Sequence, residues 1–227
     1  MKVVYEDNHL IAINKACGEI VQGDKTGDAP LSDNVKLYLK EKYDKAGNVF
    51  AGVIHRLDRP VSGLVVLAKT SKALSRMNQL FKLGEIDKTY WAVVKGRPPE
   101  NEALLDHYLV RNEKQNKSYA HAAPKEGSKQ AKLKYKVMAS SDMYSLLEVK
   151  LLTGRHHQIR CQLAAIGSPI KGDMKYGFPR SNDFSGIHLH AWSIAFVHPV
   201  KNEPVFIDAL PDVSDKLWNI CVAVKQQ

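Results

Sequence analysis

Residues 55–84 read HRLDRPVSGLVVLAKTSKALSRMNQLFKLG. They open with a polar loop that sets His55, Arg56 and Asp58 close together and is stiffened by a proline and a glycine. An Asp in such a loop usually shapes a turn or caps a helix. Flanked by an Arg and a His, between two apolar runs, it also has the setting of a reactive carboxylate. Both interpretations stay open on this stretch alone.

The rest of the stretch predicts a strand followed by a helix. Residues 64–69 read LVVLAK, an apolar run that ends in a lysine and is typical of a buried strand. Residues 70–84 then form an amphipathic helix that Ser71 can cap and Gly84 can end. Its apolar residues recur at helical spacing and are expected to face the core: Leu74, Met77, Leu80 and Phe81.

The remaining chain alternates strands and helices irregularly. Strands are predicted within 3–18 (two), then over 88–96, 102–110, 117–123, 131–139, 144–152, 188–199 and 204–209. Helices are predicted over 32–43, with Ser32 as its cap, and over 154–167 and 211–224. Because hairpin-like connections dominate the second half, the pattern favours an α+β fold with a mixed, largely antiparallel sheet over a doubly wound one. The length of 227 residues suits one sizeable domain, or one domain with a small appendage, and we expect a single domain over 1–227.

Composition restricts the possible partners. The net charge of +9 attracts polyanions, of which nucleic acid is the commonest. No stretch approaches the roughly 20 apolar residues of a membrane span, and the N-terminus lacks the pattern of a secretory signal. The three cysteines, Cys17, Cys161 and Cys221, are widely spaced and form no CxxC pair. Reduced thiols in a cytoplasmic protein without a membrane partner are therefore expected.

Several kinds of chemistry lack their motifs. The chain has no GxGxxG, no phosphate-binding GxxxxGK[ST] and no GxSxG, and its HRLD is not accompanied by the other kinase motifs. His188 and His190 share a strand face, but no carboxylate or Cys supports them at metal-ligand spacing, so no metal site is predicted. The zinc deaminase signature is absent as well.

Three polar groups stand out in apolar surroundings. Arg160 lies on a predicted helix that begins at TGR, where free N–H groups favour anions. A buried Arg needs a carboxylate, and Asp58 is the candidate partner. Tyr90 carries a hydroxyl on a strand expected in the core, and GDMKYG (172–177) is a glycine-bounded loop suited to line a cleft. Each feature alone is more often structural than catalytic.

Five motifs occur together in an order that resembles RluA-type pseudouridine synthases, which isomerise uridine in ribosomal or transfer RNA. They are HRLDRPVSGLVVLAKTSKA, KTYWAVVKG, TGRHHQIRCQL, GDMKYG and HLHAW…HP. The resemblance covers about residues 3–210. It implies the pseudouridine synthase fold, a long sheet with flanking helices around a central catalytic cleft. It also implies an RNA substrate (rRNA or tRNA) and no cofactor.

The resemblance assigns catalytic roles to three residues. Asp58 matches the essential aspartate, Tyr90 the tyrosine that contacts the target base, and Arg160 the arginine that pairs with the aspartate. A carboxylate in a desolvated pocket needs such a partner, since burial raises its pKa and an adjacent Arg lowers it. Whether the carboxylate attacks the sugar or removes a proton from it stays open.

Binding of RNA is assigned to Arg56, His55 and Arg155. Arg56 matches the side chain that enters the RNA helix where the flipped uridine leaves it, and base flipping costs roughly a few kcal/mol. Structural hydrogen bonding is the simpler interpretation of His55, and equally of His156 and His190.

The chain departs from the family pattern at three positions. Val61 replaces the usual Thr before SG, His156 replaces the Thr of TGRTHQIR, and Ala16 replaces the Pro of NKPxG. The catalytic pattern begins at residue 3, so we expect a short-form enzyme without the N-terminal RNA-binding domain. The sequence shows no heptad pattern and no obvious exposed apolar stripe, so we expect a monomer. Two alternatives remain: a base-flipping N-glycosylase that uses Asp58, and a catalytically idle RNA-binding or ribosome-assembly factor.

Overall fold

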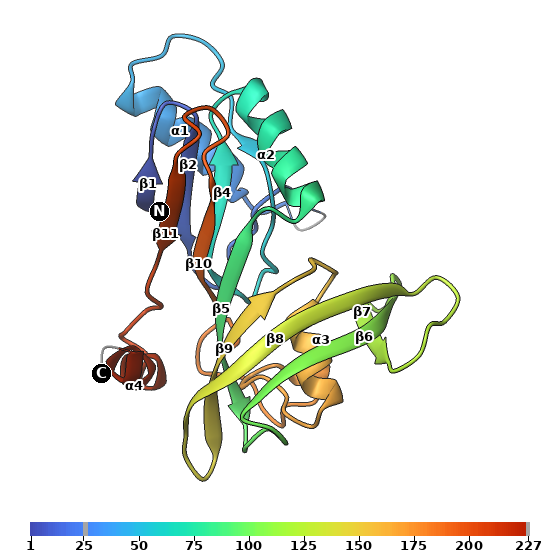
Figure 1. Ribbon diagram of the computed structural model, residues 1–227. Helices are drawn as coiled ribbons and strands as arrows, with labels where there is room; N and C mark the ends of the chain where they lie inside the picture. The colour runs from blue at the N-terminus through green and yellow to red at the C-terminus, as the bar shows by residue number, and fades with distance from the viewer. Residues whose placement is uncertain (25–26, 226–227) are drawn as a thin grey trace. The chain divides into compact units, whose positions relative to one another are not determined.

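A computed structural model describes residues 1–24 and 27–225, which divide into two compact units (Figure 1). The first unit consists of Met1–Ile86 and Ser193–Ala209, and the second of Asp87–Trp192 and Leu210–Gln227. Strand β10 (Leu189–Val197) begins in the second unit and ends in the first.

The first unit contains a small sheet in the order β1-β2-β4-β10. Its other strands are β1 (Lys2–Glu6), β2 (Leu10–Lys15), β3 (Gly52–Val53), β4 (Ser62–Ala68) and β11 (Pro204–Asp208). β1 pairs with β2, β2 and β3 with β4, and β11 with β10, all antiparallel. Asp7 forms the tight turn after β1, because its Oδ1 accepts the N–H groups of His9 and Leu10. The predicted opening strand pair is confirmed.

Two helices belong to this unit, α1 (Leu31–Lys42) and α2 (Ser71–Leu83). Thr70, not the predicted Ser71, caps α2 by accepting the N–H of Ala73, and Gly84 ends the helix at φ 76° as predicted. The predicted Ser32 cap of α1 is also wrong. The N–H groups at the start of α1 donate to the carbonyls of residues 20 and 21, so no side-chain cap is needed.

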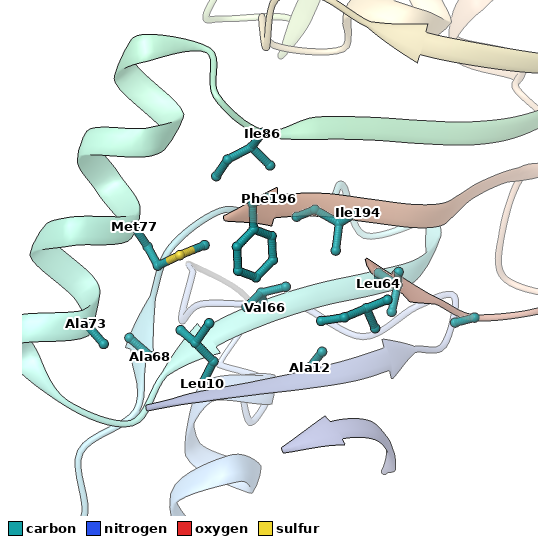
Figure 2. Close-up of a cluster of buried hydrophobic side chains, with 12 residues drawn as sticks. Leu10, Ala12, Leu64, Val66, Ala68, Ala73, Met77, Ile86, Ile194 and Phe196 are labelled. Atoms are coloured by element: carbon teal, nitrogen blue, oxygen red, sulfur yellow. The ribbon is translucent and has the colours of Figure 1, made fainter. Parts of the chain in front are cut away.

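The core of the first unit lies between α2 and the sheet (Figure 2). Alternate residues of β2 and β4 point to α2, which is the period of two expected of strands. The buried members of this cluster include Leu10, Ala12, Leu64, Val66, Ala68, Ala73, Met77, Ile194 and Phe196. The predicted apolar face of α2 is confirmed, since Leu74, Leu80 and Phe81 pack against the same cluster.

The second unit is built on an antiparallel sheet in the order β5-β9-β8-β6-β7. Its strands are β5 (Asp87–Lys95), β6 (Glu102–Asn112), β7 (Lys117–His121), β8 (Lys129–Ser140) and β9 (Tyr144–Leu151). On β8 the expected alternation is confirmed for Ala131, Leu133 and Tyr135, which are buried. A register shift between Val137 and Ala139 interrupts the alternation at the end of the strand.

Three short helical segments complete this unit: α3 (Gln158–Ala165), the 3₁₀ turn η1 (Met174–Tyr176) and α4 (Lys216–Lys225). α4 starts five residues later than predicted, and Asp215 accepts the N–H of Trp218 at 2.8 Å at its start. α4 packs Trp218, Cys221 and Val222 against β5 and β9. The α+β class and the mainly antiparallel sheet predicted from sequence are confirmed.

Candidate active site

The polar loop that carries Asp58 links β3 to β4 in the first unit. Asp58 begins a tight turn, since its carbonyl accepts the N–H of Val61 at 3.0 Å. Gly63 follows with φ 113°, a conformation that favours glycine, and lies opposite Lys15 of β2. Asp58 is partly buried. The loop therefore holds a carboxylate at a fixed point beside the end of the sheet.

Residues that follow β2 hold this turn in place through hydrogen bonds and an ion pair, and we call this set of contacts the clamp. Gly18 donates its N–H to the carbonyl of Arg59 at 2.8 Å, and Arg59 Nε donates back to the carbonyl of Gly18 at 3.0 Å. The thiol of Cys17 donates to the carbonyl of Pro60 at 3.4 Å. Arg59 also forms an ion pair with Asp28. The backbone on the C-terminal side of Asp58 is thus tied to a second loop.

A fully buried lysine, Lys15, stands at the centre of the clamp. Its Nζ donates to the carbonyls of Ala16 at 2.8 Å, Glu19 at 2.9 Å and Arg59 at 3.3 Å. Burial lowers the pKa of Lys15 to about 8, and the charges of Cys17, Glu19 and Asp58 act against that shift. The site therefore contains a lysine, beside Asp58, that sequence reasoning missed.

His55 fixes the other side of the loop. Its Nε2 accepts the N–H of Val66 at 3.1 Å, and its ring stacks on Phe81 with centroids 5.2 Å apart. β3 ends at Val53, which pairs with Leu67 of β4, and the N–H of Val66 lies one residue beyond that pair. The His55 side chain therefore supplies the hydrogen-bond acceptor that the backbone of a longer β3 would supply. This contact matches the structural interpretation of His55. Arg56, the next residue, is exposed.

Tyr90 and Arg160 belong to the second unit. Tyr90 lies in the middle of β5, opposite Val149 of β9, and is 8% exposed, as the sequence predicts for a core strand. Arg160 lies in α3 and is 5% exposed. Since Asp58 belongs to the first unit, its pairing with Arg160 stays a prediction.

Within its own unit Arg160 has a carboxylate partner that the sequence did not reveal. Its Nε and Nη2 donate to the two carboxylate oxygens of Asp173, at 2.6 and 2.9 Å. Both side chains are buried, and the Tyr176 ring lies 5.2 Å from the guanidinium carbon. Asp173 takes two of the five N–H donors of the guanidinium and fixes its plane. The only sequence signal for this pair was the glycine-bounded GDMKYG loop.

The segment before α3 differs from the prediction. The helix starts at Gln158, and His157 precedes it in the left-handed region at φ 53°. The reason is the Gln158 side chain, whose Oε1 accepts the Thr153 hydroxyl at 2.8 Å and the Arg155 N–H at 2.9 Å. These bonds hold 153–157 as a turn. Arg155 is therefore outside the helix, exposed, and donates through Nε to the carbonyl of Gln130.

A chain of hydrogen bonds runs beneath this turn. Ser118 donates its N–H to the Tyr176 oxygen at 2.9 Å, and the same hydroxyl is hydrogen-bonded to Nδ1 of His157 at 3.0 Å. Burial, together with the charges of Arg160 and His156, lowers the pKa of His157 to about 2. Burial also raises the pKa of Tyr176 well above its usual value. Both groups are neutral over the physiological range.

The part of the chain that the structure describes contains neither a metal-binding cluster nor a helix suited to span a membrane. Within 1–24 and 27–225, no group of three or more His, Cys, Asp or Glu side chains is arranged to hold a metal ion. His188, considered as a metal ligand from sequence, is buried and contacts Asp215 and Asn182. No helix in the same described ranges combines the length and apolar character needed to cross a membrane.

Comparisons with known proteins identify the family of this chain. The family model described as RNA pseudouridylate synthase matches residues 9–165. The tRNA pseudouridine synthase C of Vibrio parahaemolyticus is 31% identical over 93% of this chain and 91% of the relative. The ribosomal large subunit pseudouridine synthase D of Zymomonas mobilis is 31% identical over 92% of this chain and 68% of the relative.

The fold has solved counterparts. The structure of human RNA Pseudouridylate Synthase Domain Containing 4 matches 93% of this chain and 89% of its own, with a TM-score of 0.78 at 22% identity. That of human RNA Pseudouridylate Synthase Domain Containing 1 matches 100% and 95%, with a TM-score of 0.74. The predicted fold is confirmed, and the chain belongs to the RNA pseudouridylate synthase family.

Proposed function

We propose that this protein converts uridines of structured tRNA or rRNA to pseudouridine, with Asp58 as the catalytic carboxylate. The observation that supports the residue assignment most is the clamp on its loop. Three elements fix the turn from Asp58 to Val61: the loop after β2, the buried Lys15 amine and the His55 ring. A carboxylate that must meet a sugar carbon at a defined angle requires a rigid backbone of this kind.

The reaction rearranges one nucleotide without loss of any group. The bond between ribose C1′ and N1 of uracil breaks, the base turns, and a bond between C1′ and C5 forms. The proton on C5 leaves and another is gained at N1, so no electron acceptor is required. Asp58 can serve by attacking C1′, or by removing a proton from the sugar. We therefore propose that neither a metal nor a cofactor takes part.

Arg160 and Tyr90 complete the proposed catalytic set. Arg160 is held flat by Asp173 and by the Tyr176 ring, so that further N–H donors are aimed in a fixed direction. We propose that it pairs with Asp58 and keeps that carboxylate ionised in a desolvated pocket. Tyr90 is buried on β5 and is proposed to contact the flipped base and to assist a proton transfer.

RNA binding is assigned to Arg56, Arg155 and His55. The two arginines are exposed, which suits contacts with phosphate or with an opened RNA stack. His55 contributes by holding the loop in place. The charge excess agrees with the assignment of Arg155, since the second unit, to which it belongs, contains 19 Lys and Arg against 12 Asp and Glu.

The proposal extends to the chain as a whole. We propose one catalytic domain over residues 1–227, because the family match crosses from the first unit into the second. We also propose a cytoplasmic monomer, and the three cysteines are free thiols in agreement with a reducing compartment.

The experiment compares wild-type protein with Asp58→Asn on total tRNA and rRNA from a strain that lacks the gene. Asp28→Asn is the matched control, because Asp28 is an exposed carboxylate that forms an ion pair with Arg59, the residue that follows Asp58. Pseudouridine is mapped by carbodiimide modification and primer extension. We expect new sites with wild type and with the control, and none with Asp58→Asn.

Other outcomes would overturn parts of the proposal. Released uracil would identify an N-glycosylase. Folded, RNA-bound protein that forms no site in either RNA pool would support an assembly factor. Sites formed equally by Asp58→Asn would show that the catalytic group lies elsewhere.

A further inference from the structure

Lys88, on β5 in the second unit, is a half-buried cation that the chemistry above does not use. Burial lowers the pKa of its amine below the ordinary value for lysine. Removing a charged group from water costs free energy, and side chains kept in such a position are candidates for a functional role. Where the amine lies decides which role fits.

Lys88 and Tyr90 point to the same face of β5, because side chains two residues apart on a strand share a face. Trp91, the next residue, points to the opposite face and packs with the buried side chains of α4. Lys88 is therefore on the face of β5 that α4 does not cover, beside the tyrosine that is proposed to contact the base.

The face that Tyr90 occupies is the one on which α3 lies. Tyr90 is paired with Val149 of β9, and Val149 with Tyr135 of β8, so these three side chains share one face of the sheet. On β8, Ala131 shares the face of Tyr135 and packs in a buried cluster with Cys161 of α3. The strand face that carries Tyr90 is thus turned toward the helix of the proposed catalytic arginine.

The amine of Lys88 reaches the turn that precedes α3. Its Nζ lies 3.7 Å from the position that a Cβ would take at Gly154. Hydrogen bonds to the Gln158 side chain hold that turn, and α3, which follows it, carries Arg160. The second unit therefore brings a cation to the side of its sheet on which Tyr90 and α3 lie.

The proposed reaction creates a negative charge on the base. When the bond between C1′ and N1 breaks, its electron pair stays on N1, and the uracil anion spreads the charge over N1 and the carbonyl oxygens O2 and O4. The ribose is balanced by a new bond between C1′ and Asp58, or by loss of a sugar proton to Asp58. A cation fixed beside the base stabilises the anion, and more strongly in a desolvated site than in water.

We propose that the ammonium group of Lys88 contacts a carbonyl oxygen of the flipped uracil and stabilises the uracil anion when the C1′–N1 bond breaks. The inference rests on the isomerisation proposed above and adds a catalytic residue to it. Lys88 keeps its proton throughout, and the charge leaves the base when C5 forms its bond to C1′.

This role predicts an effect on kcat. Uracil is neutral in the bound RNA and becomes negative only as the bond breaks, so the contact with Lys88 strengthens toward the transition state and raises kcat. A phosphate is charged before, during and after the reaction. A contact between Lys88 and a phosphate would therefore act mainly on KM.

The first test measures single-turnover formation of pseudouridine in a transcript of the RNA that wild type modifies, over a range of protein concentrations. We expect Lys88→Met to lower the maximal rate at least about tenfold, with the half-saturating protein concentration within about threefold of wild type. Lys88→Arg retains the charge and should keep at least about three times the maximal rate of Lys88→Met. Lys95→Met removes an exposed lysine at the other end of β5 and is the matched control, with the rate of wild type.

Three results would overturn the proposal. One is a maximal rate of Lys88→Met close to that of wild type. Another is a loss confined to the half-saturating concentration, which indicates a contact with the RNA backbone. The third is equal rates for Lys88→Met and Lys88→Arg, which show that the charge is not needed. Thermal unfolding is measured for every variant, and Lys88→Gln replaces Lys88→Met if the latter does not fold.

The second test changes the base. Fluorine at carbon 5 withdraws electrons, so the anion of 5-fluorouracil is less basic and needs less stabilisation. The same transcript is made with 5-fluorouridine, and its consumption is followed by nuclease digestion and chromatography, since the fluorine stays on carbon 5. We expect the ratio of the wild-type rate to the Lys88→Met rate to be at least about threefold smaller than with uridine. A merely structural role of Lys88 would leave the ratio unchanged, which overturns the proposal.

These outcomes are separable from failure of the proposed function. If wild type forms no pseudouridine in tRNA or rRNA, the isomerisation fails, and the role of Lys88 fails with it. If wild type forms pseudouridine and Lys88→Met does so at the same rate, the isomerisation stands and only the role of Lys88 is overturned.

Discussion

Buried charged side chains are the most informative residues in this protein. Lys15, Arg160 and Asp173 are each at most 5% exposed, and each is hydrogen-bonded to a specific partner. Removing one partner of a buried pair leaves an uncompensated charge, which costs about 3–5 kcal/mol. Such residues are retained for stability or for chemistry, and variants can tell the two apart.

Asp173→Asn should slow isomerisation more than it weakens RNA binding. The amide cannot accept both N–H groups of Arg160, so the guanidinium loses its fixed plane. We expect kcat to fall at least about tenfold with KM within about threefold, and Asp173→Glu to restore part of kcat. Thermal unfolding is measured alongside. A kcat close to that of wild type, or a loss confined to KM, would contradict the positioning role.

Lys15 makes a prediction about stability and pH. The pKa of Lys15 is about 8 in the folded protein, whereas the ordinary value, which applies to the unfolded chain, is 10.5. Between these two pH values the unfolded chain binds more protons at Lys15 than the folded protein does. The free energy of unfolding therefore rises with pH over that window, by about 3 kcal/mol at most. The free energies of unfolding of wild type and Lys15→Met are measured with a chemical denaturant at about pH 7 and about pH 10. From the lower to the higher pH, the stability of wild type relative to the variant should increase. A constant difference would contradict the assignment.

Among the helices and strands, the helix ends show which features depend on neighbouring residues and which depend on contacts with distant parts of the chain. Thr70 caps α2 although Ser71 is an equally good candidate in the sequence, because the backbone of residue 70 is extended and residue 71 is already helical. The predicted start of α3 was four residues too early, for a different reason. Gln158 bonds to Thr153 and Arg155, and to the carbonyl of Lys132 on β8, a partner that no local pattern contains.

The cap of α2 is directly testable. Thr70→Ala should lower the free energy of unfolding by about 1 kcal/mol, since the N–H of Ala73 loses its acceptor. Ser71→Ala is the matched control and should change it by less than about 0.5 kcal/mol. Urea unfolding of the two variants decides the matter, and equal losses would show that the cap is assigned wrongly.

For the whole molecule, sequence patterns predicted the fold well and the site in part. The α+β class, the strands and α2 followed from periodicity, because alternation on β8 and the helical spacing on α2 reflect burial directly. The partner of Arg160 did not follow, since Asp173 is one of 24 acidic residues and only the folded chain selects it. Lys15 was missed likewise, because a lysine in a strand usually reaches solvent.

The charge distribution is a further property of the whole chain. The first unit contains 14 Lys and Arg and 12 Asp and Glu, so the excess of +9 comes mainly from the second unit. We expect the binding of a tRNA transcript to weaken steeply as the salt concentration rises. Variants that remove Lys or Arg side chains from the second unit should reduce this salt dependence more than variants that remove the same number from the first unit. Equal effects of the two sets would contradict this assignment.

The central claim is that Asp58 performs the isomerisation. The most direct measurement is single-turnover release of tritium from tRNA that contains uridine tritiated at carbon 5, because that hydrogen must leave when carbon 5 bonds to ribose. Wild type and Asp28→Asn should release tritium at similar rates, whereas Asp58→Asn, folded and RNA-bound, should release none above background. Tritium release by Asp58→Asn at the wild-type rate would contradict the account.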